Sequence, residues 1–170
     1  MRPYAVFLLA AFSVAALPFL GGCDKTAPAA GFGLGSAGSA GNFPPGSKQE
    51  FNGRIGDTVR FETDSAELTP EGRMILNAQA VWLRQYANYP ILIEGHADER
   101  GTREYNIALG GKRGETTKNF LIAQGINPQR IRSMSYGKER PVAVCDDISC
   151  WSQNRRTVTV LEGGGSVAAY

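Results

Sequence analysis

The sequence has few of the residues that enzymes most often use for catalysis. Its 170 residues include one histidine, His96, and three cysteines. A Ser-His-Asp hydrolase needs a histidine base, and the G-x-S-x-G turn that often carries its serine is absent. A metallohydrolase needs several clustered ligands, and His96 with Asp98 offers two. Glycoside hydrolysis needs two opposed carboxylates, which one segment with Glu94, Asp98 and Glu99 supplies poorly. We therefore expect a protein that is not an enzyme.

Charge is also low and evenly spread. The chain has 18 basic and 16 acidic residues, a formal net charge of +2. A nucleic-acid surface requires a basic patch, so we expect no nucleic-acid partner. A G-x-G-x-x-G match at residues 33–38 has no strand before it and no helix pattern after it, so it does not indicate a dinucleotide site. We expect no cofactor and no bound metal.

The first 22 residues have the pattern of an export signal. Arg2 precedes an apolar run from Tyr4 to Leu20, and two glycines then lead to Cys23. Leu-Gly-Gly-Cys resembles the lipobox of bacterial lipoproteins, which implies cleavage before Cys23 and acylation of that residue. The alternative is an ordinary membrane span, but Pro18 and the glycines interrupt the run and no basic cluster follows.

Residues 23–50 are predicted to be the lipidated cysteine and a flexible linker. Of the 26 residues from Asp24 to Gln49, 17 are Gly, Ala, Ser or Pro, without apolar periodicity. The remaining cysteines, Cys145 and Cys150, are close in the sequence. In an exported protein such a pair favours a disulfide, whereas a zinc site would need two more ligands.

The rest of the chain predicts one folded domain at residues 51–162 and a disordered tail at 163–170. Alternating or β-branched runs indicate strands, and apolar residues at helical spacing after Thr69-Pro70 and Thr102 indicate two helices. The expected order is strand 57–63, helix from 69 to about 88, strand 91–93, helix 103–124, strand 130–135, a short turn or helix at 145–151, and strand 155–161. This order predicts an α/β (α+β) two-layer sandwich, with two main helices on one face of a mixed four-stranded sheet.

The stretch from Glu94 to Arg113 holds the candidate binding residues. Arg113 lies on the face of the second helix that otherwise packs inward, where a charge is costly unless it is paired. Asp98, in the loop before that helix, is the nearby acid. Two interpretations follow: a structural Asp98–Arg113 salt bridge, or a clamp in which Asp98 binds the ammonium and Arg113 the carboxylate of a zwitterionic ligand. His96 is expected to orient the loop through a hydrogen bond.

Specific motifs in this stretch resemble those of a known family. E-G-H-A-D-E-R-G-T-R-E-Y-N at residues 94–106, followed by Leu109-Gly110 and a basic pair, is similar to the peptidoglycan-associated lipoproteins, which share the outer membrane protein A C-terminal domain. S-Y-G-K-E-R-P at 135–141 and Asn154-Arg155-Arg156 match the same pattern. The resemblance covers roughly residues 55–161.

The resemblance implies non-covalent binding of peptidoglycan through meso-diaminopimelate of its stem peptide. It implies that Asp98 takes the ligand's amine and Arg113 its carboxylate, while Asn106, Leu109, Asp64 and Ser65 line the pocket. It further implies a lipid-anchored protein of the outer membrane, facing the periplasm, that joins TolB and other Tol proteins in envelope integrity and cell division. Candidate TolB contacts are Glu99, Arg100, Thr102 and Tyr105.

Several positions leave alternatives open. Gly111 and Gly114 replace residues with higher helix propensity, which weakens that turn of the helix. Asp24 after the lipidated cysteine can signal retention in the inner membrane, although Lys25 follows it and the outer membrane is favoured. A lipoprotein that acts mainly through protein–protein contacts, without wall binding, is the alternative function.

Overall fold

The computed structural model describes residues 43–163. The predicted signal segment 1–22, the lipidation site Cys23 and the tail beyond Gly163 lie outside the described residues. Within them, none of the helices is both long and apolar enough to cross a membrane.

The described residues form short helices, two long helices and four strands. In chain order these are α1 (Lys48–Glu50), the π-helical turn η1 (Phe51–Ile55), β1 (Thr58–Arg60), α2 (Pro70–Gln85), β2 (Ile91–His96), α3 (Arg103–Ala123), the 3-10 turn η2 (Pro128–Arg130), β3 (Ile131–Gly137), α4 (Ile148–Asn154) and β4 (Arg156–Leu161).

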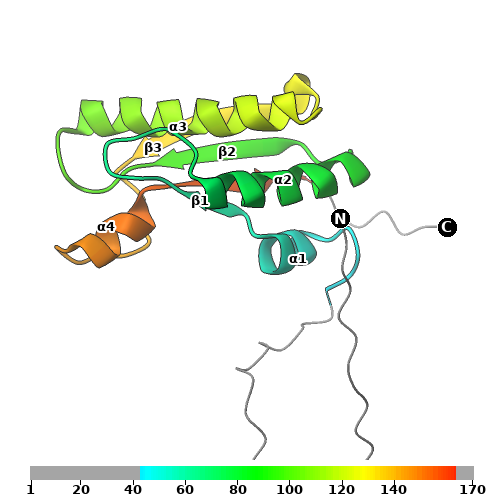
Figure 1. The fold of residues 1–170 in the computed structure, drawn as a ribbon, viewed down its shortest axis with the longest axis horizontal. Coiled ribbons are helices and arrows are strands. Elements are labelled where there is room, and N and C mark those ends of the chain that lie inside the picture. The colour runs from blue at the N-terminus through cyan, green and yellow to red at the C-terminus, as the bar shows by residue number, and fades with distance from the viewer. Residues whose placement is uncertain (1–42, 164–170) are drawn as a thin grey trace, which may run out of the picture. The chain divides into compact units, whose positions relative to one another are not determined.

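The four strands form one mixed sheet in the order β1-β4-β2-β3. The last strand, β4, lies between β1 and β2 and is antiparallel to both, whereas β2 and β3 are parallel. The first two strands therefore run in the same direction, although they are not neighbours. The loop before α2, the loop before α3, and α4 lie at the same end of the sheet (Figure 1).

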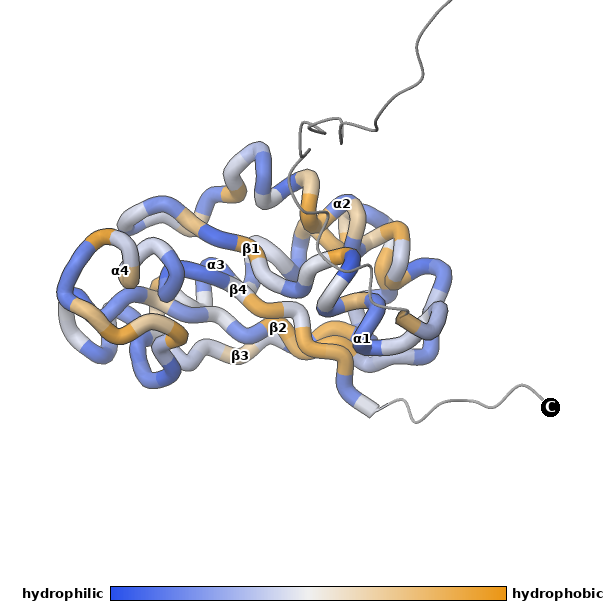
Figure 2. The backbone as a smooth tube through the Cα atoms, turned by 90° about the horizontal axis from the view of Figure 1, so that it is seen from below, coloured by the Kyte–Doolittle hydropathy of each residue, from blue (hydrophilic) through white to orange (hydrophobic). Residues whose placement is uncertain are grey.

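Both long helices pack on one face of the sheet. Thr157 and Thr159 are two residues apart on β4 and so point to the same face. The Thr157 hydroxyl is 3.0 Å from that of Thr117 on α3, and the Thr159 hydroxyl donates to Gln79 on α2 at 2.8 Å. Hydrophobic segments gather where β2 and β4 lie near α1 and α2 (Figure 2). The predicted two-layer sandwich is confirmed.

The folded part begins earlier than the linker prediction allows. Ser47 caps α1 by accepting a hydrogen bond from the N–H of Glu50 at 3.1 Å. The Glu50 carboxylate is buried and accepts from the indole of Trp82 at 2.9 Å. The hydrogen bond from Trp82, followed by that from the N–H of Gly46, lowers the Glu50 pKa against the opposing effect of burial. The prediction of a flexible linker is therefore wrong for residues 47–50. The Gly-, Ser- and Pro-rich composition of the segment hides the point at which the fold begins.

Several element boundaries also differ from the prediction. Strand β2 continues to His96, so this residue ends a strand instead of lying in the loop. Strand β3 continues to Gly137, and β1 is only three residues long. The helix starts are where the caps predict them: the side chains of Thr69 and Thr102 accept hydrogen bonds from the N–H groups of Gly72 and Tyr105.

Candidate functional site

A cavity of about 310 Å³ lies beside the carboxyl end of β2. Two loops form it, one after β1 and one between β2 and α3, together with the first turns of α3. Its lining residues are Thr63, Asp64, Asp98, Arg100, Gly101, Tyr105, Asn106 and Leu109. Four of the six residues predicted to bind the ligand, Asp64, Asp98, Asn106 and Leu109, thus line one cavity.

Asp98 is a buried carboxylate with two arginine partners. Its Oδ2 accepts from Arg100 at 2.7 Å and from Arg155 at 3.3 Å. Burial by itself raises the Asp98 pKa, but the hydrogen bonds and charge of Arg100, helped by Arg155, lower it overall. Asp98 is therefore negatively charged at neutral pH and can attract a cation to the cavity.

Arg113 lies beneath this region and is completely buried. Its Nε donates to the carbonyl of Ser65 at 2.8 Å, Nη1 to that of His96 at 2.9 Å and Nη2 to that of Glu62 at 3.0 Å. Burial lowers the Arg113 pKa to about 10, against the opposing effect of Asp98, so it stays charged at neutral pH. One side chain thus ties the loop after β1 to the end of β2.

The predicted structural salt bridge between Asp98 and Arg113 is not formed. Among residues 43–163, Asp98 has ion pairs with Arg100 and Arg155 and none with Arg113. Arg113 is satisfied by backbone carbonyls, which carry no signature in the sequence. Arg155 is a site residue that the sequence reasoning missed, although it belongs to the Asn154-Arg155-Arg156 motif that carried part of the family resemblance.

Close packing of β2 on α3 fixes where the helix presents its side chains. A Cβ atom built on Gly95 would lie 2.0 Å from the carbonyl oxygen of Gly110, a distance that real Cβ atoms do not reach. Glycine at Gly95 therefore allows strand and helix to approach with their backbones in contact. On the turn before Gly110, buried Asn106 donates to the carbonyl of Arg100 at 2.6 Å and holds the loop against the helix.

The other predicted residues either have structural roles or line one of two cavities. Ser65 does not line the cavity with Asp64, but its carbonyl is bound by Arg113. Of the candidate TolB contacts, Arg100 and Tyr105 line the same cavity as Asp98, and the Tyr105 hydroxyl donates to Asp64. Thr102 caps α3. The fourth candidate, Glu99, lines a second cavity.

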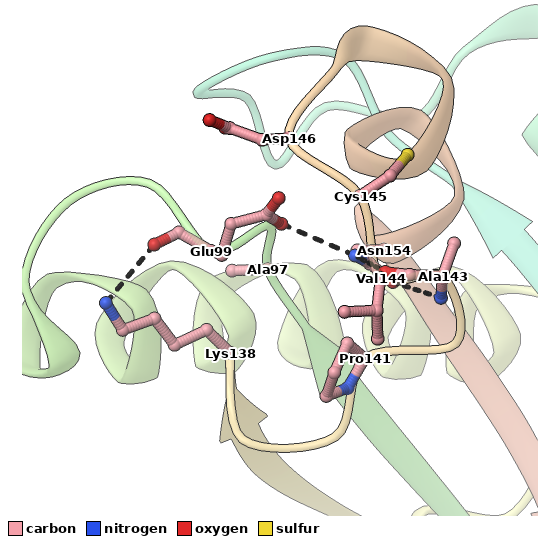
Figure 3. A pocket seen from close by; sticks show the side chains of 9 residues that line it. All are labelled: Ala97, Glu99, Lys138, Pro141, Ala143, Val144, Cys145, Asp146 and Asn154. Atoms are coloured by element: carbon pink, nitrogen blue, oxygen red, sulfur yellow. Dashed lines mark hydrogen bonds between the residues drawn. The ribbon is translucent and has the colours of Figure 1, made fainter.

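The second cavity lies between the β2–α3 loop and the disulfide-bridged segment (Figure 3). Its volume is about 340 Å³, and its lining residues are Ala97, Glu99, Lys138, Pro141, Ala143, Val144, Cys145, Asp146 and Asn154. Asn154 holds its wall by accepting from the N–H of Val142 at 2.9 Å and donating to the carbonyl of Ala143 at 2.8 Å. The predicted Cys145–Cys150 disulfide is present in this segment.

His96 does not make the side-chain hydrogen bond predicted for it. Its ring is buried and stacked on Tyr136, and neither ring nitrogen has a hydrogen-bond partner among the described residues. Burial, followed by the charges of Arg156 and Arg140, lowers the His96 pKa to about 4, so the ring is neutral at pH 7. It is the backbone carbonyl of His96 that orders the loop region, by binding Arg113.

Within residues 43–163 no group of three metal-ligating side chains could hold an ion.

Comparison with known proteins agrees with this fold. The model of the OmpA family matches residues 60–155. Peptidoglycan-associated lipoproteins of Rhizobium meliloti and Mesorhizobium japonicum are 56% and 54% identical, over 86% and 90% of this chain and 84% and 90% of theirs. The crystal structure of the peptidoglycan-associated lipoprotein from Burkholderia pseudomallei is 35% identical with a TM-score of 0.64, and covers 67% of this chain and 98% of that one.

These relatives are named as lipoproteins and not as enzymes, which agrees with the expectation from the sequence. The extent of the match and the shared fold decide the family. The chain belongs to the OmpA family, in the group of the peptidoglycan-associated lipoproteins.

Proposed function

We propose that the protein is a lipid-anchored, non-covalent binder of peptidoglycan that recognises meso-diaminopimelate of the stem peptide. Anchored through Cys23 in the outer membrane, with the domain in the periplasm, it would tether that membrane to the cell wall within the Tol–Pal system. The observation that carries the proposal is the convergence of Asp64, Asp98, Asn106 and Leu109 on one cavity. It agrees with the names of the relatives, which are peptidoglycan-associated proteins.

The chemistry of the cavity suits the cationic part of this ligand. Diaminopimelate carries an ammonium and a carboxylate at its free end. Asp98 is ionised and lines the cavity together with Asp64, so an ammonium there meets two acidic side chains. Leu109 offers an apolar contact for the ligand's methylene chain. Charge-assisted hydrogen bonds to a partly buried carboxylate are among the stronger polar contacts in proteins.

The carboxylate part of the ligand has two candidate partners. Gly101 lines the cavity and precedes Thr102, the cap of α3, so the helix N-terminus lies beside the cavity. Unpaired N–H groups and the helix dipole favour an anion there. The direct contact with Arg113 remains a prediction, because Arg113 is covered in this structure and its Nε, Nη1 and Nη2 atoms already donate to carbonyls.

Sedimentation with purified peptidoglycan tests the proposal. The wild-type chain should pellet with the sacculi and be released by a soluble peptide that carries meso-diaminopimelate. Asp98→Asn removes the charge and keeps the shape of the side chain, and should abolish retention. Asp146→Asn makes the same chemical change at an exposed residue of the second cavity and should leave retention intact. Equal retention of both variants would refute the site.

The alternative function, protein–protein contact without wall binding, has its own supporting observation. Val142, Val144 and Ile148 are 61%, 89% and 70% exposed beside the second cavity. Such apolar side chains on one segment are typical of an interaction surface. A pull-down with TolB that persists in Asp98→Asn but is lost in Val144→Asp would assign TolB binding to this segment. Binding of TolB together with no retention on sacculi would favour the alternative.

A further inference from the structure

The cation that occupies Asp98 in this structure belongs to the protein itself. The Nη2 atom of Arg100 lies 2.7 Å from Asp98 Oδ2, and Arg100 lines the same cavity as Asp98. A guanidinium on this carboxylate is in the position that a ligand ammonium needs. The two positive groups would repel each other if both stayed there.

The second arginine partner of Asp98, Arg155, is far less exposed than Arg100. Arg155 has a side chain that is 7% exposed, and its Nε also donates to the carbonyl of Phe61 at 3.1 Å. The side chain of Arg100 is 42% exposed. Arg155 is therefore a fixed part of the fold, whereas Arg100 can move into solvent.

The Arg100 side chain can leave without disturbing the loop that carries it. The backbone of Arg100 is held separately, because its carbonyl accepts from buried Asn106 at 2.6 Å. Besides the ion pair itself, a cation–π contact with Trp151 helps to keep the guanidinium near Asp98, since the Arg100 guanidinium carbon lies 4.4 Å from the centre of that ring. Trp151 lies on α4, directly after the disulfide-bridged Cys150.

We propose that Arg100 is an internal competitor for the Asp98 carboxylate, held in place by Trp151, and that a ligand ammonium binds by displacing it. This inference rests on the proposed function of the cavity. It makes Arg100 a residue that lowers affinity, in contrast to a ligand-contacting residue, whose removal weakens binding. Because a partly exposed ion pair and a cation–π contact are each worth little, the expected gain on removing Arg100 is about two- to tenfold.

Isothermal titration of the full chain in mild detergent with a meso-diaminopimelate stem peptide tests the inference. Arg100→Ala should bind the peptide about two- to tenfold more tightly than wild type. Arg103→Ala is the matched control, because it removes the same charge from a 66% exposed residue that pairs with Glu139 and does not line the cavity. Its affinity should stay within about twofold of wild type, as for other exposed ion pairs. Trp151→Leu should also tighten binding, because it releases Arg100 without changing the charge.

The outcomes separate this inference from the proposed function. If wild type binds the peptide tightly and Arg100→Ala binds it equally or more weakly, the competitor role of Arg100 is refuted and the proposed binding site is retained. Absence of binding by both wild type and Arg100→Ala overturns both. Adding Asp98→Asn to Arg100→Ala should remove binding again, which shows that the gained affinity depends on the released carboxylate. An equal gain in Arg103→Ala would mean a general charge effect and would also overturn the competitor.

Discussion

Replacing Arg113 by methionine tests whether this buried arginine holds the site together. Methionine fills a similar volume but donates no hydrogen bond. The carbonyls of Ser65, His96 and Glu62 would then lose the donors that bind them at 2.8, 2.9 and 3.0 Å. The loop after β1 and the end of β2 would be left without their shared contact.

The size of the effect follows from how well water can replace the lost donor. The hydrogen bond to His96 is buried, so its carbonyl would remain unpaired, at a cost of about 2 to 3 kcal/mol. The bonds to Ser65 and Glu62 are partly buried, and water would restore part of their energy, leaving about 0.5 to 1 kcal/mol each. We expect Arg113→Met to lower the free energy of unfolding by about 3 to 5 kcal/mol.

Urea unfolding followed by circular dichroism measures this change. With a slope of about 1 to 3 kcal/mol per molar urea, the midpoint should fall by more than about 1 M. Arg103→Met, at an exposed ion pair, should change the free energy of unfolding by less than about 1 kcal/mol. A loss below about 1 kcal/mol in Arg113→Met would refute the scaffolding role. Until stability is measured, lost peptidoglycan binding in an Arg113 variant is not evidence of a direct ligand contact.

Three further predictions concern packing, pH and the disulfide. A Cβ on Gly111 would make ordinary contact with Ser135 at 3.9 Å, so Gly111→Ala should raise the free energy of unfolding by about 0.5 to 1 kcal/mol. A Cβ on Gly110 would meet Ser135 at 2.5 Å, so Gly110→Ala should lower the free energy of unfolding. Equal effects of the two substitutions in urea unfolding would contradict this. Because the His96 pKa is lowered to about 4 from 6.5, the unfolded state binds more protons between these values, so stability should be complete above pH 6.5 and fall as the pH drops toward 4. His96→Phe should flatten that dependence, and an unchanged pH profile would count against the buried neutral ring. Replacing Cys145 and Cys150 together by serine opens a short loop and should lower stability by about 2 kcal/mol, as read from the melting temperature; no change would show that the bridge adds nothing.

Local sequence signals predict most of the architecture. The caps at Thr69 and Thr102 locate the starts of both long helices, and strand patterns locate all four strands within about three residues. These signals are local because a cap bonds to N–H groups a few residues away. The Cys145–Cys150 pair is predictable for the same reason, since five positions separate the two residues.

Several contacts that build the site are long-range and leave no local signal in the sequence. Arg155 reaches Asp98 across 57 positions, and Arg113 reaches Ser65 and Glu62 across 48 and 51. The acceptors of Arg113 are backbone carbonyls, which every residue has, so the sequence could indicate a buried charge but not its partners. Similarly, Gly95 looks unremarkable until α3 is seen packed against it.

Titration of the wild-type chain with two stem peptides tests the central claim most directly. One peptide carries meso-diaminopimelate and the other carries lysine at the same position, which keeps the ammonium but lacks the neighbouring carboxylate. Because the helix N-terminus beside the cavity favours that carboxylate, the lysine peptide should bind at least about tenfold more weakly, a difference of about 1.4 kcal/mol. Equal affinity for the two peptides, or no binding of the diaminopimelate peptide, would contradict the account.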